Sequence, residues 1–288
     1  MYPEPMRGVF PVLVTPFDNQ DRVDEDSLRS VVEYNIGAGV HGLTIAFASE
    51  IAKLTEAERA SVAEVVIDQT RGRVPVVVNT GAVSTYATVC YSRQAEDLGA
   101  TAVMCTPPSA DVPASERRAY FKAISDAITI PLFIQEAGTV LGGPLMRQIA
   151  EESERVRYAK VENAPPAQKV YEAVQHTAGL VTVFGGASGS VLIEELRRGS
   201  QGTMPWPSRP HAFVEVWDCW QAGDETTARS AWEAAIAPLL RVGGVVHKEI
   251  LYREGIITSP RWRAPSPAPL DDITQREFDE TCERLGIG

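Results

Sequence analysis

The heptapeptide VRYAKVE, at positions 156–162, is the most informative part of this sequence. Its apolar and aromatic residues predict a short buried strand, which ends before Pro165 and Pro166. One lysine, Lys160, lies inside this strand. Because an ammonium group in a sheet core is costly unless it is paired or loses its proton, this lysine requires a physical reason.

Lys160 has two interpretations at this point. Burial favours a neutral amine, which can attack a carbonyl carbon and form a Schiff base. Alternatively, Lys160 ends an edge strand and forms an ion pair with Glu162. The other lysines fall in stretches that we interpret as loops or polar helix faces: Lys53, Lys122, Lys169 and Lys248.

The composition favours a protein that acts on small molecules. A chain of 288 residues, 44% of them hydrophobic, can bury the core of one barrel-sized domain or of two smaller ones. The net charge of −11 argues against nucleic acid and anionic membrane surfaces as partners, since both bind basic surfaces. No apolar stretch approaches the roughly 20 residues of a membrane-spanning helix. The four cysteines form no C-x-x-C pair, and we expect a cytoplasmic protein.

Strand patterns and helix patterns alternate along the first two thirds of the chain. The expected strands span residues 8–17, 41–47, 74–80, 101–106, 131–135, 156–162, 180–184 and 202–205. The expected helices span residues 24–38, 55–70, 86–98, 115–128, 145–152, 167–178 and 190–198. Eight strands that are too apolar for a half-exposed sheet predict an α/β fold, a parallel (β/α)8 TIM barrel covered by helices. A doubly wound open sheet is the alternative, but the chain has no G-x-G-x-x-G opening.

Strand patterns stop near Pro207. The remaining chain predicts helices over residues 211–221, 225–242, 245–254 and 273–285. We therefore expect a barrel at residues 1–206 and a C-terminal helical extension at residues 207–288, packed on the barrel.

Polar residues mark the ends of two neighbouring strands. Lys160 and Glu162 end the sixth strand, and Gln135 and Glu136 end the fifth. Active-site residues of parallel barrels project from the carboxyl ends of the strands, so this placement favours the Schiff-base interpretation of Lys160. The four histidines show no metal-ligand spacing, and we expect no metal site.

Several motifs occur in the same order as in a known family. They are GVFPVLVTPF at positions 8–17, Glu50 after the second strand, Thr106-Pro107 after the fourth and Lys160 in the sixth. In these features the chain resembles the dihydrodipicolinate synthase and N-acetylneuraminate lyase family, which are pyruvate-handling lyases and dehydratases on a (β/α)8 barrel with a helical tail. The resemblance implies that Lys160 forms an imine with a 2-oxo acid, that no cofactor is needed, and that the chain assembles as a homotetramer.

The chain departs from the family pattern at several sites. The family's Gly-Thr-Thr-Gly-Glu, which holds the substrate carboxylate, is AFASE at positions 46–50, where the N–H groups of Ala48 and Ser49 are the remaining candidates. The family's proton-shuttling tyrosine of strand five corresponds to Gln135, which we place among the catalytic residues because of this correspondence, although an amide cannot act as an acid or a base. The synthase's arginine for a second carboxylate falls near Val140. These departures argue against the lysine-pathway synthase reaction, and proton transfer needs another group.

Glu162 is the candidate for proton transfer. Two residues after Lys160 on an extended strand, it points to the same side. It can therefore remove a proton at C3 of an imine and return it to a leaving hydroxyl. The alternative is that Glu162 is a counter-ion of Lys160 or a helix cap. Glu50 is interpreted as a structural residue that pairs within its loop.

Three further residues are candidate substrate contacts. Glu136 follows Gln135 at the end of the fifth strand. Gly185 and Gly186 open a glycine-rich turn whose backbone can approach a polar ligand group, although a plain tight turn explains them equally well.

We therefore predict a class I lyase that acts on a 2-oxo acid. Its reaction is either aldol cleavage or condensation with pyruvate, or dehydration of a 2-keto-3-deoxy sugar acid. The alternative is a catalytically silent barrel that serves as a 2-oxo acid binding or regulatory protein.

Overall fold

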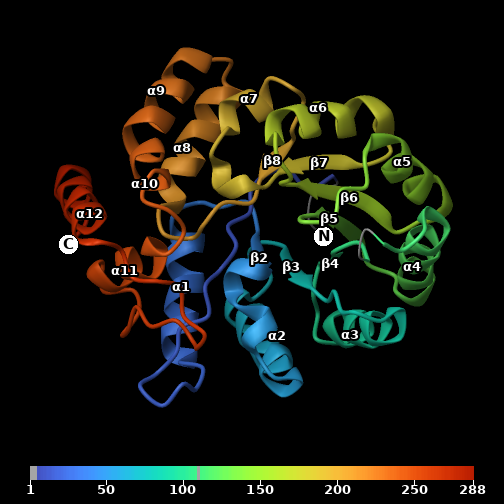
Figure 1. Ribbon diagram of the computed structural model, residues 1–288, viewed down its shortest axis with the longest axis horizontal. Coiled ribbons are helices and arrows are strands. Elements are labelled where there is room, and N and C mark those ends of the chain that lie inside the picture. The colour runs from blue at the N-terminus through green and yellow to red at the C-terminus, as the bar shows by residue number, and fades with distance from the viewer. Residues whose placement is uncertain (1–4, 109–110) are drawn as a thin grey trace.

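The computed structural model describes residues 5–108 and 111–288. Its eight strands form one parallel sheet in the order β1-β8-β7-β6-β5-β4-β3-β2. A parallel bridge between Val12 and Thr44 joins the two ends of this sheet, and helices surround it (Figure 1). The predicted (β/α)8 barrel is confirmed.

The strands lie where the sequence predicts them, but several are shorter. Their bounds are Gly8–Val9 for β1, Leu43–Ile45 for β2, Val76–Asn79 for β3, Ala102–Cys105 for β4, Leu132–Glu136 for β5, Val156–Val161 for β6, Thr182–Gly185 for β7 and Gly202–Thr203 for β8. The first predicted strand, residues 8–17, is reduced to two residues. Pro11 and Pro16 lie within it, and a proline has no N–H to donate to a strand ladder.

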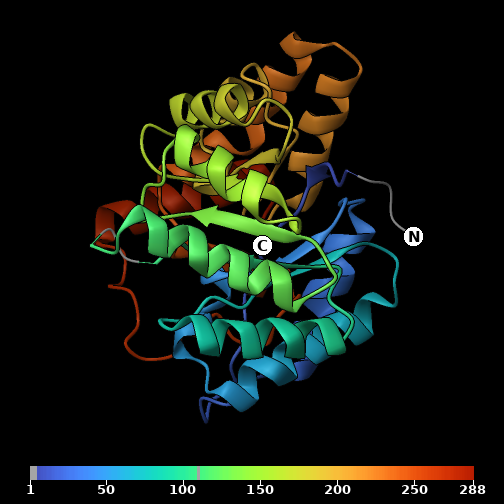
Figure 2. The ribbon, with the colours of Figure 1, turned by 90° about the vertical axis from the view of Figure 1, so that its right-hand side faces the viewer.

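Seven helices of the barrel pack on the outside of the sheet. Their bounds are Glu25–Gly37 for α1, Glu56–Thr70 for α2, Thr85–Asp97 for α3, Ala114–Ala127 for α4, Gly143–Glu152 for α5, Pro166–Thr177 for α6 and Leu192–Leu196 for α7. The teal and green helices α3, α4 and α5 run side by side over the outside of the barrel (Figure 2). Local signals define several helix starts: Asp24 caps α1, and Thr55 and Glu58 form a capping box at the start of α2.

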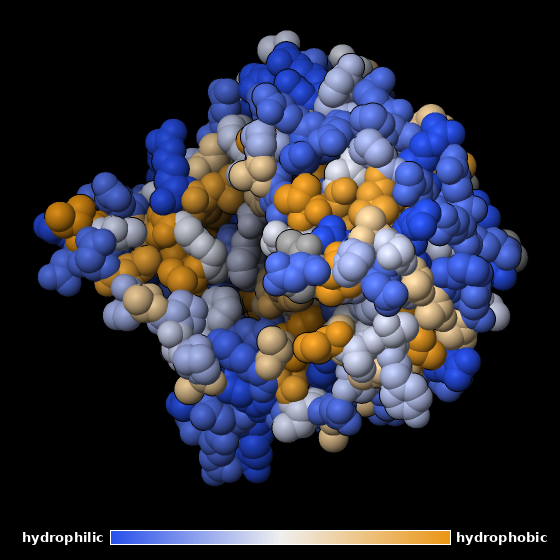
Figure 3. Space-filling model, turned by 45° about the vertical axis from the view of Figure 1, so that its right-hand side comes forward, coloured by the Kyte–Doolittle hydropathy of each residue, from blue (hydrophilic) through white to orange (hydrophobic). Residues whose placement is uncertain are grey.

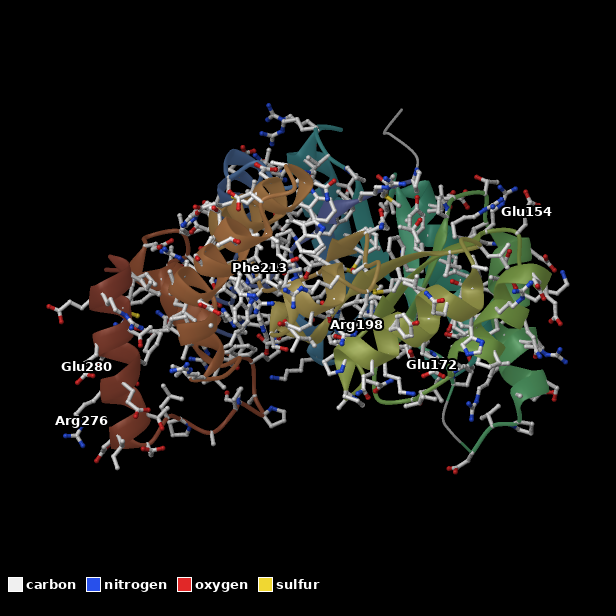
Figure 4. All side chains as sticks on the ribbon, turned by 90° about the horizontal axis from the view of Figure 1, so that it is seen from above. Glu154, Glu172, Arg198, Phe213, Arg276 and Glu280 are labelled. Atoms are coloured by element: carbon white, nitrogen blue, oxygen red, sulfur yellow. The ribbon has the colours of Figure 1, made fainter. Side chains whose placement is uncertain are left out.

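After β8 the described chain contains helices but no further strand. These are α8 (Pro210–Gln221), α9 (Glu225–Ala235), α10 (Ala237–Leu240), α11 (Val246–Arg253) and α12 (Asp272–Leu285). Helix α8 packs against both β1 and α9. Figure 4 shows α12, which carries Arg276 and Glu280, at the edge of the molecule opposite the barrel helix that carries Glu172.

One predicted helix of this extension is wrong. Residues 225–242 form two helices, α9 and α10, which meet at Ile236. Pro238 lies two residues further on, and a proline inside a continuous helix would remove one hydrogen bond and clash with the preceding turn. The break therefore has a local cause in the sequence.

The inside of the barrel is closed by a layer of large side chains. Phe133 and Tyr158 stack with ring centroids 4.4 Å apart, and Phe184 meets Phe133 edge to face at 5.6 Å. A second, larger apolar layer lies between the sheet and the helices. On the surface, hydrophobic side chains gather around a recess on the face shown in Figure 3. Because the barrel is filled, a ligand can enter only above this aromatic layer, at one end of the strands.

Candidate active site

A cavity of about 300 Å³ opens at the carboxyl end of the barrel. Its walls are mostly apolar or aromatic, with one lysine and one carboxylate: Val12, Phe47, Ala48, Lys160, Glu162, Ser188, Met204, Pro205, Trp206 and Trp262. Within residues 5–108 and 111–288, no arginine and no tyrosine lines it. The lysine and the carboxylate are thus the ionisable groups that a ligand meets.

Lys160 and Glu162 form an ion pair inside the barrel. Lys160 Nζ lies 3.1 Å from Glu162 Oε2, with the two side chains 5% and 20% exposed. The pairing interpretation is therefore correct in its contact, but β6 is not an edge strand, since it lies between β5 and β7. Tyr158, Lys160 and Glu162 are spaced by two residues, which places all three on the inner side of the strand.

Gln135 holds Glu162 from behind. Its Nε2 donates to Glu162 Oε1 at 2.7 Å, and its Oε1 accepts a hydrogen bond from Asn79 Nδ2 at 2.7 Å. Gln135 is completely buried and does not line the cavity. The catalytic role expected for Gln135 is therefore corrected to positioning, because Glu162 stands between it and any ligand.

Asn79 was missed by the sequence analysis. It is the last residue of β3 and lies two positions after Val77, which belongs to the inner apolar layer. A single amide that ends an otherwise apolar strand on its inner side was the available signal.

The loop after β2 contributes one of its two expected binding residues. Ala48 lines the cavity. Ser49 does not: its N–H donates to Ala46 O at 2.9 Å and its hydroxyl donates to Leu13 O at 2.5 Å. The expected role of Ser49 in carboxylate binding is wrong in this conformation, because the 3-10 turn Phe47–Ser49 already uses its amide.

Glu136 faces away from the cavity. Its Oε1 accepts hydrogen bonds from the backbone of Leu141 at 2.9 Å and of Gly142 at 3.3 Å. Burial raises the pKa of this carboxyl. Because side chains alternate along a strand, the inward position of Gln135 turns Glu136 outward, and the expected substrate contact is replaced by a loop contact.

Gly185 and Gly186 make room for two carboxyl groups. A Cβ on Gly186 would lie 2.5 Å from Glu162 Cβ, and a Cβ on Gly185 would lie 1.8 Å from Glu195 Oε2. Neither glycine lines the cavity. The expected contact of these glycines with substrate is therefore corrected: they allow the side chains of Glu162 and Glu195 to approach the end of β7.

Glu195, on α7, is a second unexpected group. Its side chain is completely buried, and neither carboxyl oxygen has a hydrogen-bond partner in the described part of the chain. Burial, followed by the nearby charges of Glu194 and Glu162, raises its pKa to about 8. Glu195 is therefore mostly protonated at neutral pH.

A second lysine is buried beside the cavity. Lys248, on α11, is fully buried, and its Nζ donates to Glu50 Oε1 at 2.5 Å and to Arg261 O at 2.9 Å. Burial lowers its pKa to about 8. The interpretation of Lys248 as part of a polar helix face is wrong, because α11 packs its lysine inward. The expected pairing of Glu50 within its loop is confirmed by its 2.8 Å contact with Lys53.

Two tryptophans line the same cavity as Lys160. Trp206 follows β8, stacks on His247 with centroids 4.5 Å apart, and donates from Nε1 to Ser188 Oγ at 2.9 Å. Trp262 comes from the segment between α11 and α12, and its ring meets that of Trp206 at 6.4 Å. The sequence analysis missed both, since nothing local places residue 262 over the barrel.

A parallel barrel whose cavity ends on a buried lysine with a carboxylate beside it is an arrangement typical of lyases that hold their substrates as lysine imines. A model of the dihydrodipicolinate synthetase family matches residues 5–277, and the chain belongs to this family. The chain is thus a class I lyase that acts on a 2-oxo acid, as an aldolase or as a dehydratase.

The similar proteins include a dehydratase and synthases. The chain is 33% identical to an L-2-keto-3-deoxyarabonate dehydratase of Azospirillum brasilense over 97% of this chain and 94% of that protein. It is 28% identical to a 4-hydroxy-tetrahydrodipicolinate synthase of Methanospirillum hungatei, with 96% of each chain covered. The crystal structure of a dihydrodipicolinate synthase from Rhodopseudomonas palustris superimposes with a TM-score of 0.88, at 27% identity and 97% coverage of both chains.

Two further properties concern the residues that the structure describes. They contain no group of three or more histidine, cysteine or acidic side chains that could hold a metal ion. None of their helices combines the length and the apolar character needed to cross a membrane.

Proposed function

We propose that the chain dehydrates a 3-deoxy-2-oxo sugar acid through an imine on Lys160. The observation that carries this proposal is the arrangement at Lys160, where a carboxylate stands 3.1 Å from the amine and the described cavity wall includes no tyrosine. One carboxylate beside an imine can both remove a proton and return it, which is what the loss of water requires. The similarity to a 2-keto-3-deoxyarabonate dehydratase supports the same reaction.

The reaction begins with attack of the Lys160 amine on the C2 carbonyl, with loss of water to form the imine. Glu162 Oε2 then removes a proton from C3, and the electron pair of the C–H bond passes into the enamine. The enamine expels the C4 hydroxyl, which takes the proton from Glu162 and leaves as water. Hydrolysis of the imine returns the Lys160 amine, so the net change is the loss of one water molecule from the substrate.

The remaining walls suit a substrate with one charged end. The N–H of Ala48 is the candidate donor for the carboxylate next to the imine carbon. No arginine lines the described cavity, so the described wall has no guanidinium group to bind a second carboxylate of a substrate. The rings of Trp206 and Trp262 offer apolar faces for the hydroxylated carbon chain. A neutral sugar chain fits this wall better than a dicarboxylate.

We also propose a cytoplasmic homotetramer. The four cysteines are free thiols, and Cys90 is exposed, which suits a reducing compartment. Val83 and Tyr86 are exposed hydrophobic residues just after β3, where contact between subunits would cover them.

The test offers 2-keto-3-deoxyarabonate to the purified protein and, separately, pyruvate with an aldehyde. The proposal expects a product lighter than the sugar acid by one water, with no release of pyruvate, and no condensation product in the second reaction. Release of pyruvate would make the protein an aldolase and overturn the proposal. Imine formation without any turnover would identify a binding protein instead.

A further inference from the structure

A series of hydrogen bonds runs from the backbone of the β3–α3 loop through the side chains of Asn79 and Gln135 to Glu162, the carboxylate beside Lys160. The Gly81 N–H donates to Asn79 Oδ1 at 3.0 Å, and Asn79 Nδ2 donates to Gln135 Oε1 at 2.7 Å. Gln135 Nε2 then donates to Glu162 Oε1 at 2.7 Å. This series crosses the inside of the barrel from β3 to β5 and β6.

The direction of these hydrogen bonds is fixed at the backbone end. A backbone N–H can only donate, so it requires the oxygen of the Asn79 amide on its side. The nitrogen of Asn79 must then face Gln135, which turns the oxygen of Gln135 toward Asn79 and its nitrogen toward Glu162. Asn79 is 3% exposed and Gln135 is fully buried, so water cannot readily replace either partner.

This orientation of Gln135 makes the two carboxyl oxygens of Glu162 unequal. Oε1 faces a donor, so it is held as an acceptor and is a poor place for a proton. Oε2 faces Lys160 Nζ at 3.1 Å, where the imine would form. A proton carried by Glu162 therefore sits on Oε2, the oxygen beside the reacting atoms.

We propose that Asn79 is a positioning residue for proton transfer. It keeps the Gln135 amide turned so that Glu162 takes up and returns its proton through Oε2 alone. If Gln135 were turned over, its oxygen would face Glu162 Oε1, and Glu162 would hold its proton on the side away from the imine. This inference rests on the proposed role of Glu162.

Further hydrogen bonds hold the backbone at the start of this hydrogen-bond series, around Asn79 and Gly81. Arg59, on α2, directs Nη2 toward the carbonyl oxygens of Asn79 and Gly81, at 3.4 Å and 3.5 Å. In addition, the N–H of Thr80 donates to Met104 O at 2.9 Å, which ties the end of β3 to β4. The amide of Asn79 is thus set on a rigid element, as an orienting group requires.

The test measures Asn79→Ala, Gln135→Leu and the double variant. Each single variant is expected to lower kcat about 10-fold, with KM little changed, because Glu162 remains but its carboxyl group is no longer oriented. The borohydride-trappable imine should persist in all three. The double variant should be no slower than Gln135→Leu, because Asn79 acts only through Gln135.

The control is another buried asparagine. Asn35, on α1, is also fully buried and donates to Val31 O and to Pro207 O, the residue after Trp206, but none of these hydrogen bonds reaches Asn79, Gln135 or Glu162. Asn35→Ala should lower the melting temperature as much as Asn79→Ala does, yet leave kcat unchanged. If Asn79→Ala does not fold, Asn79→Ser replaces it, because serine still accepts from Gly81 but is too short to reach Gln135.

The outcomes separate this inference from the proposed function. Normal kcat in Asn79→Ala, or losses that multiply in the double variant, would overturn the role of Asn79 while Glu162→Gln remains inactive. Normal kcat in Glu162→Gln would instead overturn the proposed role of Glu162, and this inference with it.

Discussion

Glu162 divides its two oxygens between two partners, Gln135 on one side and Lys160 on the other. This division supports a single group that acts first as base and then as acid. Glu162→Gln should therefore keep the borohydride-trappable imine, since Lys160 is untouched, but lower kcat by roughly 100-fold or more. Glu136→Gln is the matched control, because Glu136 faces the β5–α5 loop. Near-normal turnover in Glu162→Gln, with loss of activity in Glu136→Gln, would place the proton transfer on strand β5.

Glu195 makes the stability of the fold depend on pH. Its pKa is raised from 4.5 to about 8 in the folded protein. The folded state therefore binds this proton more tightly than the unfolded state, and the resulting stability is complete below about pH 4.5 and is lost as the pH rises through about 8. Relative to Glu195→Gln, which stays neutral, the free energy of unfolding of the native protein should fall by a few kcal/mol between these limits. Urea unfolding at several pH values measures this difference. If the free energies of unfolding of the native protein and of Glu195→Gln changed with pH in parallel, the prediction would be contradicted.

Among single residues, the sequence predicted the two that share one strand. Lys160 and Glu162 are two positions apart, so strand periodicity alone puts them together. Gln135 was also predicted as a site residue, but its contacts were not, and Asn79 and Glu195, from two further elements, were missed. Their contacts depend on how the barrel closes and on the space left by two glycines, and neither is visible in local patterns.

Residues 256–264 form a segment that is tied across the carboxyl end of the barrel. Arg263 forms an ion pair with Glu58 at 2.6 Å and donates to Lys53 O at 3.0 Å. Lys248 and Lys53 each donate to a carbonyl of this segment at 2.9 Å. These contacts hold Trp262 over the cavity.

Releasing this segment should weaken substrate binding more than turnover. Arg263→Ala removes the contact with Glu58, and we expect KM to rise several-fold while kcat changes less than about 2-fold, as for the loss of uniform binding. Arg253→Ala is the control, since Arg253 pairs with Glu249 on the same helix, α11, and with Asp279 on α12. Steady-state kinetics would contradict the idea if both variants raised KM equally, or if Arg263→Ala lowered kcat alone.

Helix starts were predictable where a cap is local, as at Asp24 and Thr55, whereas the break at Ile236 was missed although Pro238 is close by. The segment that carries Trp262 was not predictable, because its place depends on an ion pair between positions 58 and 263. A contact across 205 residues leaves no periodic signal in the sequence.

In the whole molecule, the alternation of strands and helices was enough to predict the barrel. The exact length of each strand was not predictable, because bridges such as Val12 with Thr44 depend on barrel closure. The face of α11 that points inward was not predictable either, because the burial of Lys248 depends on how this helix packs on the barrel.

The proposed assembly predicts the mass of the protein in solution. We expect a homotetramer built as a dimer of dimers, as the family resemblance implies. Sedimentation velocity at micromolar concentration should then give about four times the chain mass of 31.3 kDa. A species of one chain mass would contradict it. Tyr86→Glu, which places a charge on an exposed hydrophobic position after β3, should shift the distribution toward smaller species, whereas Tyr252→Glu on α11 should not.

Reduction with borohydride in the presence of a 2-oxo acid tests the central claim most directly, because the protein has two buried lysines near one cavity. Only Lys160 lines that cavity; Lys248 is enclosed by Glu50 and the carbonyl of Arg261. We predict one adduct per chain by intact mass, mapped by peptide analysis to Lys160 and absent in Lys160→Ala. An adduct on Lys248, labelling spread over the exposed lysines, or no adduct with any 2-oxo acid would contradict a lyase that works through Lys160.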